Sequence, residues 1–264
     1  MQLVRYEGGF GRLESDKVIP LGQDIMEFLQ TGVVNGDGEG LPLSGLRLLA
    51  PVRKPGKIIC VGLNYRDHAA ETGLAVPADP PLFCKFANSV ADPGVTVKVP
   101  RVVTSLDYEA ELGVVIGRTA RDVSVADALD YVAGYTCAND VSARELQFRT
   151  SQWTAGKAID AFLPMGPMLI TPDELGDPQQ LPIRCWVNGE LRQDGSTADM
   201  IFGVAELIAY VTRTMTLEPG DVLVTGTPGG VGMSSSPPRY LSEGDEVSVE
   251  IGALGRLSNR FSWQ

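Results

Sequence analysis

The pattern of hydrophobic and polar positions along the chain predicts many short strands and few helices. Lys57–Leu63 is an almost continuous apolar run, which is typical of a buried strand. Leu106–Ile116 instead alternates apolar and polar residues with the period of two of a half-buried strand. Further apolar runs predict strands at Leu82–Phe86, Val95–Val99, Val132–Cys137, Met168–Ile170, Ile183–Val187, Val222–Thr225, Val247–Ile251 and Arg256–Phe261.

Helical spacing is confined to a few segments. Val125–Tyr131 and Val204–Thr214 show it between the predicted strands. The start of the chain has its own pattern, in which a hairpin, a helix-like stretch and a glycine-rich linker are expected near Gly8–Gly9, at Asp24–Gln30 and at Gly32–Gly40. We therefore expect a small N-terminal domain over residues 1–50 and a main domain over residues 51–264. The excess of strands predicts a β-rich α+β fold rather than a doubly wound sheet.

The polar face of the run Leu106–Ile116 carries the first chemical signal. The strand period places Glu109 and Glu111 on the same face, about 7 Å apart. Two carboxylates at that distance repel each other unless water or a cation lies between them. Apolar residues fill the opposite face, so a solvent-exposed pair on a half-buried strand is an equal alternative. This run alone leaves solvent exposure and metal binding open.

Asp140 adds a third carboxylate at the end of a later apolar run. After it, Ser142 is expected to cap a short helix that carries Arg144 and Gln147 on one side. An Asp at such a junction is more often a turn residue than a metal ligand. Three carboxylates without a nearby histidine or cysteine nevertheless suit a hard cation, Mg²⁺, Mn²⁺ or Ca²⁺ rather than Zn²⁺. Three protein ligands would leave positions for water and substrate, as in a catalytic site.

Other candidate catalytic groups lie outside these strands. His68, the only histidine, has Glu71 three residues later, so on a helical turn Glu71 would orient the imidazole. The Gly-, Ala- and Pro-containing segment that follows, up to Pro81, is a candidate lid. Lys157 lies between a glycine and an apolar stretch, and Thr227 lies in a glycine-rich turn that follows a predicted strand. An exposed histidine and a solvated lysine are the ordinary alternatives.

Composition narrows the class of protein. The 264 residues are 44% hydrophobic and 21% charged, as in a globular chain with a sizeable core. The net charge of −11 argues against a nucleic-acid surface. The four cysteines form no C-x-x-C pair and read as core residues in a reducing compartment. No apolar stretch approaches the roughly 18 residues of a membrane span, and no signal-peptide pattern opens the chain, so we expect a cytoplasmic protein without membrane partners.

Taken together, these motifs resemble the fumarylacetoacetate hydrolase family. The matching segments, in chain order, are Val61–Tyr65 with His68 and Glu71, Glu109–Glu111, Asn139–Arg144 with Gln147, Gly156–Lys157, and Gly226–Gly232. The resemblance implies a catalytic domain with a mixed β-roll or β-sandwich fold and short helices, paired into a homodimer. It also implies Mg²⁺ or Mn²⁺ as the cofactor, with Ca²⁺ as a substitute in crystals.

The resemblance assigns roles to the candidate residues. Glu109, Glu111 and Asp140 carry over as metal ligands, and His68, Glu71 and Lys157 as catalytic groups. Arg144, Gln147 and Thr227 carry over as groups that bind a small keto-acid substrate. Some members that act on small acids have arginine where Leu63 stands, so a very small, doubly charged substrate is less favoured here.

We therefore expect a metal-dependent hydrolase that cleaves a carbon–carbon bond of a 2,4-dioxo acid through a metal-stabilised pyruvate enolate. The substrate would be an acylpyruvate, fumarylpyruvate or a diketo-deoxy sugar acid. Oxaloacetate decarboxylation and isomerisation of an unsaturated dioate are alternatives, since both need the same enolate. A non-catalytic metal-stabilised binding module is an alternative of another class, but such a module needs neither the His68–Glu71 pair nor Lys157.

Overall fold

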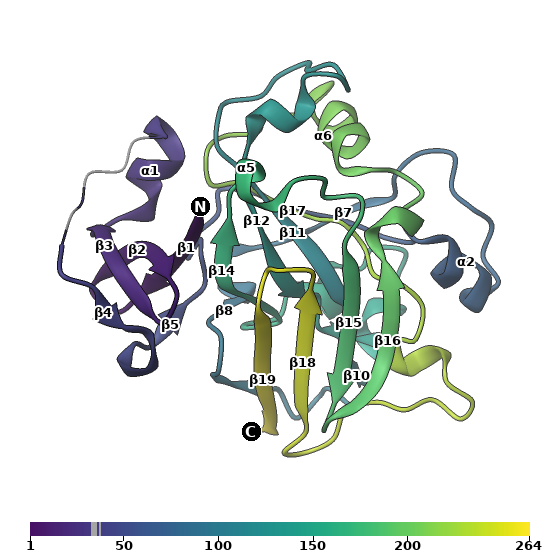
Figure 1. Cartoon of the computed structure of the whole chain (residues 1–264). Coiled ribbons are helices and arrows are strands. Elements are labelled where there is room, and N and C mark those ends of the chain that lie inside the picture. Colours follow the sequence, from purple (N-terminus) through teal and green to yellow (C-terminus); the bar gives the residue numbers. More distant parts are fainter. Residues whose placement is uncertain (33–35, 37) are drawn as a thin grey trace.

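The computed structural model describes residues 1–32, 36 and 38–264. Its described residues form a strand-rich α+β fold with short helices, which confirms the predicted fold class (Figure 1). The α-helices are α1 (Ile25–Thr31), α2 (Arg66–Thr72), α3 (Arg144–Gln147), α4 (Thr154–Lys157), α5 (Pro172–Leu175) and α6 (Val204–Thr212). Single 3₁₀ turns cover Leu43–Gly45, Ala87–Ser89, Ala128–Tyr131, Thr197–Asp199 and Gly232–Ser234. Among the described residues, no helix combines the length and apolar character that a membrane crossing requires.

The larger sheet runs in the order β4-β3-β2-β1-β14-β12-β11-β17-β6-β7, with β5 beside β1 and β8 beside β14. Its strands are β1 (Gln2–Tyr6), β2 (Gly9–Glu14), β3 (Lys17–Gly22), β4 (Leu41–Pro42), β5 (Leu48–Leu49), β6 (Ile58–Val61), β7 (Leu82–Lys85), β8 (Val90–Ala91), β11 (Ala110–Ile116), β12 (Val132–Asn139), β14 (Leu163–Ile170) and β17 (Val222–Val224). In Figure 1 its central strands lie behind the second sheet.

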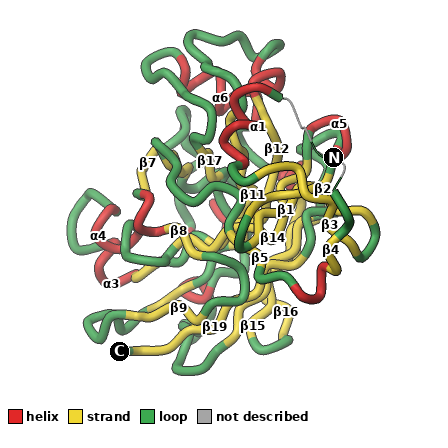
Figure 2. The backbone as a smooth tube through the Cα atoms, turned by 90° about the vertical axis from the view of Figure 1, so that its left-hand side faces the viewer, coloured by secondary structure: helices red, strands yellow, loops and turns green. Residues whose placement is uncertain are grey.

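The second sheet has the order β16-β15-β18-β19-β9. Its strands are β9 (Thr96–Val99), β15 (Pro182–Val187), β16 (Glu190–Ser196), β18 (Glu246–Ile251) and β19 (Arg256–Trp263), and a separate pair joins β10 (Leu106–Asp107) to β13 (Ser142–Ala143). Figure 2 shows the arrangement from the side, with α3 and α4 next to each other at one edge of the molecule.

The largest apolar core lies between the two sheets, and β11 shows how the sequence builds it. Leu112, Val114 and Ile116 point into the core shared with β15, β18 and β19, as the alternation predicts. Val115, on the opposite face, joins a second core that includes Phe28 and Leu29 of α1. Both faces of β11 are therefore covered, and every residue of the strand is buried. Polar residues on this strand cannot be solvent-facing.

The N-terminal segment is continuous with the larger sheet. Strand β1 pairs antiparallel with β14, with Leu3 opposite Leu169. The predicted hairpin is present as β1 and β2, and the predicted helix as α1. Part of the expected linker Gly32–Gly40 lies outside the described residues. The division at residues 50 and 51 into two domains stays a prediction.

Three local expectations are wrong in detail. The single strand predicted over Leu106–Ile116 is interrupted at Tyr108–Glu109 and forms β10 and β11. No helix covers Val125–Tyr131: the Ser124 hydroxyl accepts a hydrogen bond from the Asp127 amide and makes a turn, so only a 3₁₀ turn follows. The predicted strand Met168–Ile170 is the end of the longer β14, whose prolines and glycine hid its beginning.

Candidate active site

Three buried carboxylates meet where β11 begins and β12 ends. These strands are antiparallel neighbours with Ala110 opposite Asn139, so Glu109 and Glu111 flank that pair while Asp140 follows it. The Asp140 amide donates to the Glu109 carbonyl over 2.9 Å. One oxygen from each carboxylate lies within 4.8 Å of the others, and the three residues are 5%, 1% and 0% exposed. The solvent-exposed alternative for the two glutamates is therefore wrong.

Buried cations surround two of these carboxylates. The Lys157 ammonium lies 2.6 Å from Glu109 Oε2 and 2.7 Å from Asp140 Oδ2. Arg144 Nη2 lies 2.7 Å from Glu109 Oε1, and Lys85 Nζ lies 2.7 Å from Asp140 Oδ1. Burial alone would raise the pKa of Glu109, but Lys157 and Arg144 together lower it to about 2. A surface lysine at position 157 is ruled out, since Lys157 is buried.

Glu111 has no such cation among the ion pairs of the described residues. Its polar contact is the Gly226 amide, which donates to Oε2 over 2.6 Å. Burial, followed by repulsion from Asp140 and Glu109, raises the pKa of Glu111 well above its ordinary value. The buried cluster as a whole, with Asp107, holds four carboxylates against Lys85, Arg144 and Lys157.

This cluster fits a bound cation. It has more carboxylates than cations, Glu111 has no cation partner among the described residues, and every candidate ligand atom is a carboxylate oxygen. Oxygen-only donor sets suit hard divalent cations such as Mg²⁺ or Mn²⁺. Glu109, Glu111 and Asp140 are thus a group that could hold a metal ion, and the identity of that ion stays a prediction.

The three predicted substrate-binding residues line the same pocket as the glutamates, and each of them has a hydrogen bond with a neighbouring side chain. Arg144 donates from Nε to Asp107 over 2.9 Å and from Nη1 to Gln147 Oε1 over 2.9 Å. Thr227 Oγ1 accepts from Gln193 Nε2 over 2.8 Å, so its own hydroxyl proton is free to point elsewhere. Arg144 thus contacts Glu109 directly, and Gln147 and Asp107 hold the Arg144 side chain.

The helix that carries Arg144 and Gln147 is present as α3, but its predicted cap is wrong. Ala143 is the residue at the N-cap position, and it makes no side-chain capping bond. The Ser142 hydroxyl instead donates to the Asp140 carbonyl over 2.9 Å. Ser142 lies in the short strand β13, which pairs with β10, so the helix starts one residue later than a Ser142 cap would place it.

His68 and Glu71 lie one turn apart on α2, as predicted. His68 Nδ1 lies 3.2 Å from Glu71 Oε2, and His68 is buried rather than on an exposed turn. The Gly230 amide donates to both oxygens of Glu71, at 3.0 and 3.2 Å. Burial alone would raise the pKa of Glu71, but hydrogen bonds with His68 and Gly230 lower it below its ordinary value. The Gly229 amide donates to Asp67, so two contacts fix α2 to the glycine-rich turn.

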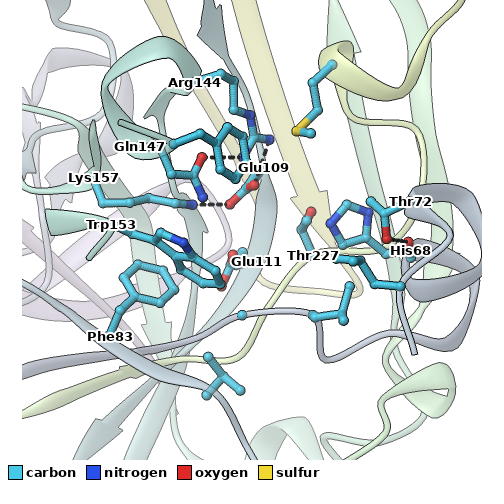
Figure 3. A pocket seen from close by; sticks show the side chains of 16 residues that line it. His68, Thr72, Phe83, Glu109, Glu111, Arg144, Gln147, Trp153, Lys157 and Thr227 are labelled. Carbon is cyan, nitrogen blue, oxygen red and sulfur yellow. Dashed lines mark hydrogen bonds and ion pairs between the residues drawn. The ribbon is translucent and has the colours of Figure 1, made fainter. Parts of the chain in front are cut away.

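These groups surround one pocket of about 250 Å³. Figure 3 shows Lys157, Glu109 and Glu111 on one side and His68 with Thr227 on the other. The pocket is lined by Val61, Gly62, Leu63, His68, Thr72, Leu74, Phe83, Glu109, Glu111, Arg144, Gln147, Phe148, Trp153, Lys157, Thr227 and Met233. Two predicted residues lie behind the lining: Glu71 holds His68, and Asp140 holds Lys157. The structure thus brings all nine predicted residues together, while their roles stay predictions.

Three buried polar residues of this site were missed from the sequence. Lys85 is fully buried and donates to the carbonyls of Val141, Phe162 and Lys157 as well as binding Asp140. Asp107 accepts from Arg144 and from the amides of Gly232 and Met233.

The third missed residue, Gln193, accepts from the Ala110 amide and donates to Thr227. Each of these residues is a polar position in a short strand, and sequence alone does not distinguish it from a solvated side chain.

Comparisons with known proteins identify a family and several relatives of this chain. The model of the fumarylacetoacetate hydrolase C-terminal family matches residues 57–262. Oxaloacetate tautomerase YisK of Bacillus subtilis is 48% identical over 223 residues, 83% of this chain and 74% of that protein. Mitochondrial oxaloacetate tautomerase Fahd2a of Rattus norvegicus is 47% identical over 221 residues, 83% of this chain and 71% of that protein.

A solved structure has the same fold as this chain. Fumarylacetoacetate hydrolase from psychrophilic Exiguobacterium antarcticum superimposes with a TM-score of 0.90 at 37% identity, over 100% of both chains. The resemblance drawn from the motifs is therefore confirmed, and with it the expectation of an enzyme rather than a non-catalytic binding module. The chain belongs to the fumarylacetoacetate hydrolase family and is an enzyme of that family.

Proposed function

We propose that this protein is a tautomerase that interconverts the enol and keto forms of oxaloacetate. The relatives that bear this name share almost half of their aligned residues with the chain. Their names favour the isomerase alternative over hydrolysis of a 2,4-dioxo acid, which was the leading expectation from sequence. Leu63 points the other way, because a very small, doubly charged substrate is less favoured when leucine stands at this position. The identity of the substrate therefore has to be tested directly.

The proposal rests on the placement of one proton-transfer group and one charge-stabilising ammonium around a single pocket. His68 and Lys157 come from different elements and line the same cavity as Glu109 and Glu111 (Figure 3). Tautomerisation adds one proton at C3 and removes one from the oxygen on C2, and water is not a reactant. A histidine that gives a proton to C3 and an ammonium that stabilises the enolate oxygen on C2 are sufficient for this reaction, since the enol O–H proton passes to solvent as the substrate binds as its enolate.

His68 is the group that we assign to the proton at C3. Its Nδ1 is held by Glu71, which leaves Nε2 as the ring nitrogen available to the pocket. Glu71 is itself fixed by the Gly230 amide, so the imidazole orientation is set by α2 and the glycine-rich turn together. Glu71 is thus a positioning residue for His68.

Lys157 is the group that we assign to the oxygen on C2. Its buried ammonium donates to Glu109 and Asp140 and faces the pocket, where it can stabilise an oxygen that gains negative charge. Glu109, Glu111 and Asp140 would hold a divalent cation, which supplies Lewis-acid stabilisation of the same charge when bound. The apolar lining at Phe83 and Trp153 restricts water at this end of the pocket.

Two parallel assays test this function. The loss of enol-oxaloacetate is followed by its ultraviolet absorbance with Mg²⁺ or Mn²⁺, and pyruvate is measured in the same samples with lactate dehydrogenase. We expect enzyme-dependent loss of enol with no enzyme-dependent pyruvate. Pyruvate release from an acylpyruvate, or from oxaloacetate itself, at a rate above enol conversion would instead support the hydrolase or the decarboxylase.

A further inference from the structure

The pocket has an aromatic wall that the proposed proton transfers do not use. Phe83 of β7 and Trp153, just before α4, meet edge to face with ring centroids 5.4 Å apart and planes at 66°. The Trp153 ring lies so close to Gly62 that a Cβ atom at position 62 would come within 2.5 Å of it. Leu63, next in the chain, lines the same pocket with its backbone in the left-handed region at φ 48°. Leu63, Phe83 and Trp153 all line the pocket, and we call these three apolar residues the aromatic wall.

The aromatic wall begins directly beside the polar end of the site. The Lys157 ammonium lies 5.0 Å from the centre of the Phe83 ring. A substrate with its oxygens at Lys157 and the carboxylates therefore meets aromatic surface with the next part of its skeleton. An aryl or bulky apolar substituent gains contacts there, and edge-to-face packing favours a ring. A second carboxylate at the same place loses its hydration without gaining a partner.

The charges of the pocket lead to the same conclusion. The permanently charged cations in the lining are Lys157 and Arg144, and both are already ion-paired with carboxylates. The buried cluster has one more carboxylate than cations, so a divalent ion bound there would leave a single positive charge. That charge is balanced by one substrate carboxylate. The two carboxylates of a dianion would have to share that single positive charge.

We propose that this site also tautomerises 2-oxo monoacids that carry an aryl or bulky apolar group at C3, with phenylpyruvate as the simplest aryl member. The inference rests on the proposed tautomerase function and names a further substrate class for the same site. In the ketonisation step the enol O–H loses its proton and C3 gains one. The C2=C3 double bond becomes single while the C2–O bond becomes a carbonyl. Nothing is oxidised, reduced or released.

The first experiment compares ketonisation of enol-phenylpyruvate and enol-oxaloacetate by the wild type, Phe83→Ala and Phe86→Ala, each with Mg²⁺. Phe86 is the matched control, since it is an exposed phenylalanine three residues away that does not line this pocket. We expect wild-type kcat/KM for phenylpyruvate to equal or exceed that for oxaloacetate. Phe83→Ala should lower the phenylpyruvate-to-oxaloacetate ratio of kcat/KM by at least about tenfold, and Phe86→Ala should not change it.

The second experiment measures binding without turnover. Oxanilate, a monoanion with a phenyl ring, and oxalate, a dianion without one, are titrated calorimetrically into the same three proteins with Mg²⁺. We expect Phe83→Ala to weaken oxanilate binding by at least about tenfold relative to its effect on oxalate, with Phe86→Ala behaving as wild type.

The outcomes separate this inference from the proposed function. A wild type that converts enol-oxaloacetate but leaves enol-phenylpyruvate at its uncatalysed rate overturns the inference and leaves the proposed function standing. A wild type that converts neither enol overturns the proposed tautomerase and with it this substrate class, even where oxanilate binds through Phe83. Equal effects of Phe83→Ala and Phe86→Ala on the ratio and on binding overturn the aromatic wall as a determinant of specificity.

Discussion

His68 and Glu71 lie one helical turn apart, and their contact is the part of the site most fully determined by local sequence. Replacing His68 by Gln keeps a hydrogen-bonding side chain but removes the proton-transfer group. We predict that His68→Gln lowers the rate of enol-oxaloacetate ketonisation by roughly 10²–10⁴-fold, the usual contribution of a general acid or base. The metal-ligand candidates are untouched, so oxalate affinity, measured calorimetrically with Mg²⁺, should stay at the wild-type value. An unchanged rate would remove His68 from the mechanism.

Glu109 and Glu111 are two residues apart but differ in their partners. Glu109 is paired with Lys157 and Arg144, whereas Glu111 accepts from the Gly226 amide and has a raised pKa. We predict that, in EDTA, Glu111→Gln leaves the free energy of unfolding unchanged or higher because it removes unpaired negative charge. Glu109→Gln should lower it by about 3–5 kcal/mol, since it leaves buried cations without a partner.

Urea unfolding of the two variants makes this comparison directly, and both variants should also lose Mg²⁺-dependent activity. A larger stability loss in Glu111→Gln than in Glu109→Gln would contradict the charge balance described for the cluster.

Lys85 was not predicted as a site residue, although its side chain is fully buried beside Asp140. Its ammonium binds Asp140 and the carbonyls of Val141, Phe162 and Lys157, so it joins the metal-ligand candidate to the segment that carries Lys157. We predict that Lys85→Met lowers the free energy of unfolding by about 3–5 kcal/mol, because Asp140 loses a buried partner. Lys98→Met, at an exposed lysine, is the control for urea unfolding. Similar midpoints for both variants would exclude this role.

Some residues of the site could be predicted from a local pattern, whereas roles for Lys157, Arg144 and Thr227 came from the family resemblance. The spacing of Glu109 and Glu111 and the turn between His68 and Glu71 are such patterns. The ion pair between Lys157 and Glu109 joins positions 48 residues apart, and no local signal links them. Lys85 reads as an ordinary polar residue of a strand, because its burial depends on segments that follow it much later in the chain.

At the scale of elements, the contact between α2 and the glycine-rich turn Gly226–Gly232 holds the His68–Glu71 pair in the pocket. Gly230 has φ 97°, and a Cβ atom there would lie 2.1 Å from the Arg192 carbonyl. We predict that Gly230→Ala displaces the turn, removes the amide contact with Glu71 and lowers ketonisation at least about tenfold, since a small misplacement of a catalytic group is costly.

The control for that variant is Gly189→Ala. Gly189 also has a positive φ, at 80°, but a Cβ atom there meets nothing within 4 Å. The Gly189→Ala variant should lose about 1–2 kcal/mol of stability, because alanine disfavours this backbone conformation, and it should keep wild-type kinetics. Thermal unfolding and initial rates of both variants make the comparison, and equal losses of activity would mean that the turn does not position Glu71.

The elements themselves were predicted best where the hydrophobic pattern was regular. The alternation in β11 and the helical spacing in α6 were both recovered. The break at Tyr108–Glu109 was not, because the apolar alternation continues through it while the backbone changes partner from β13 to β12. The strand pairing was also hidden: β1 joins β14 with Leu3 opposite Leu169, and such distant pairing leaves no local pattern.

At the scale of the whole molecule, the order of the motifs along the chain predicted the fold and the family. It did not predict the reaction. Hydrolysis, decarboxylation and tautomerisation need the same carboxylates, histidine and lysine, so these residues cannot separate them. The names of the relatives favour tautomerisation. The homodimer and the cytoplasmic location stay predictions.

The most direct test of the central claim is time-resolved proton NMR of enol-oxaloacetate with the enzyme and Mg²⁺, which follows the enol, the keto form and pyruvate in one sample. We predict that the enzyme accelerates the conversion of enol to keto in proportion to its concentration, that EDTA abolishes this acceleration, and that pyruvate appears only at the enzyme-free rate. Enol decay at the uncatalysed rate, or enzyme-dependent pyruvate as the main product, would contradict the account.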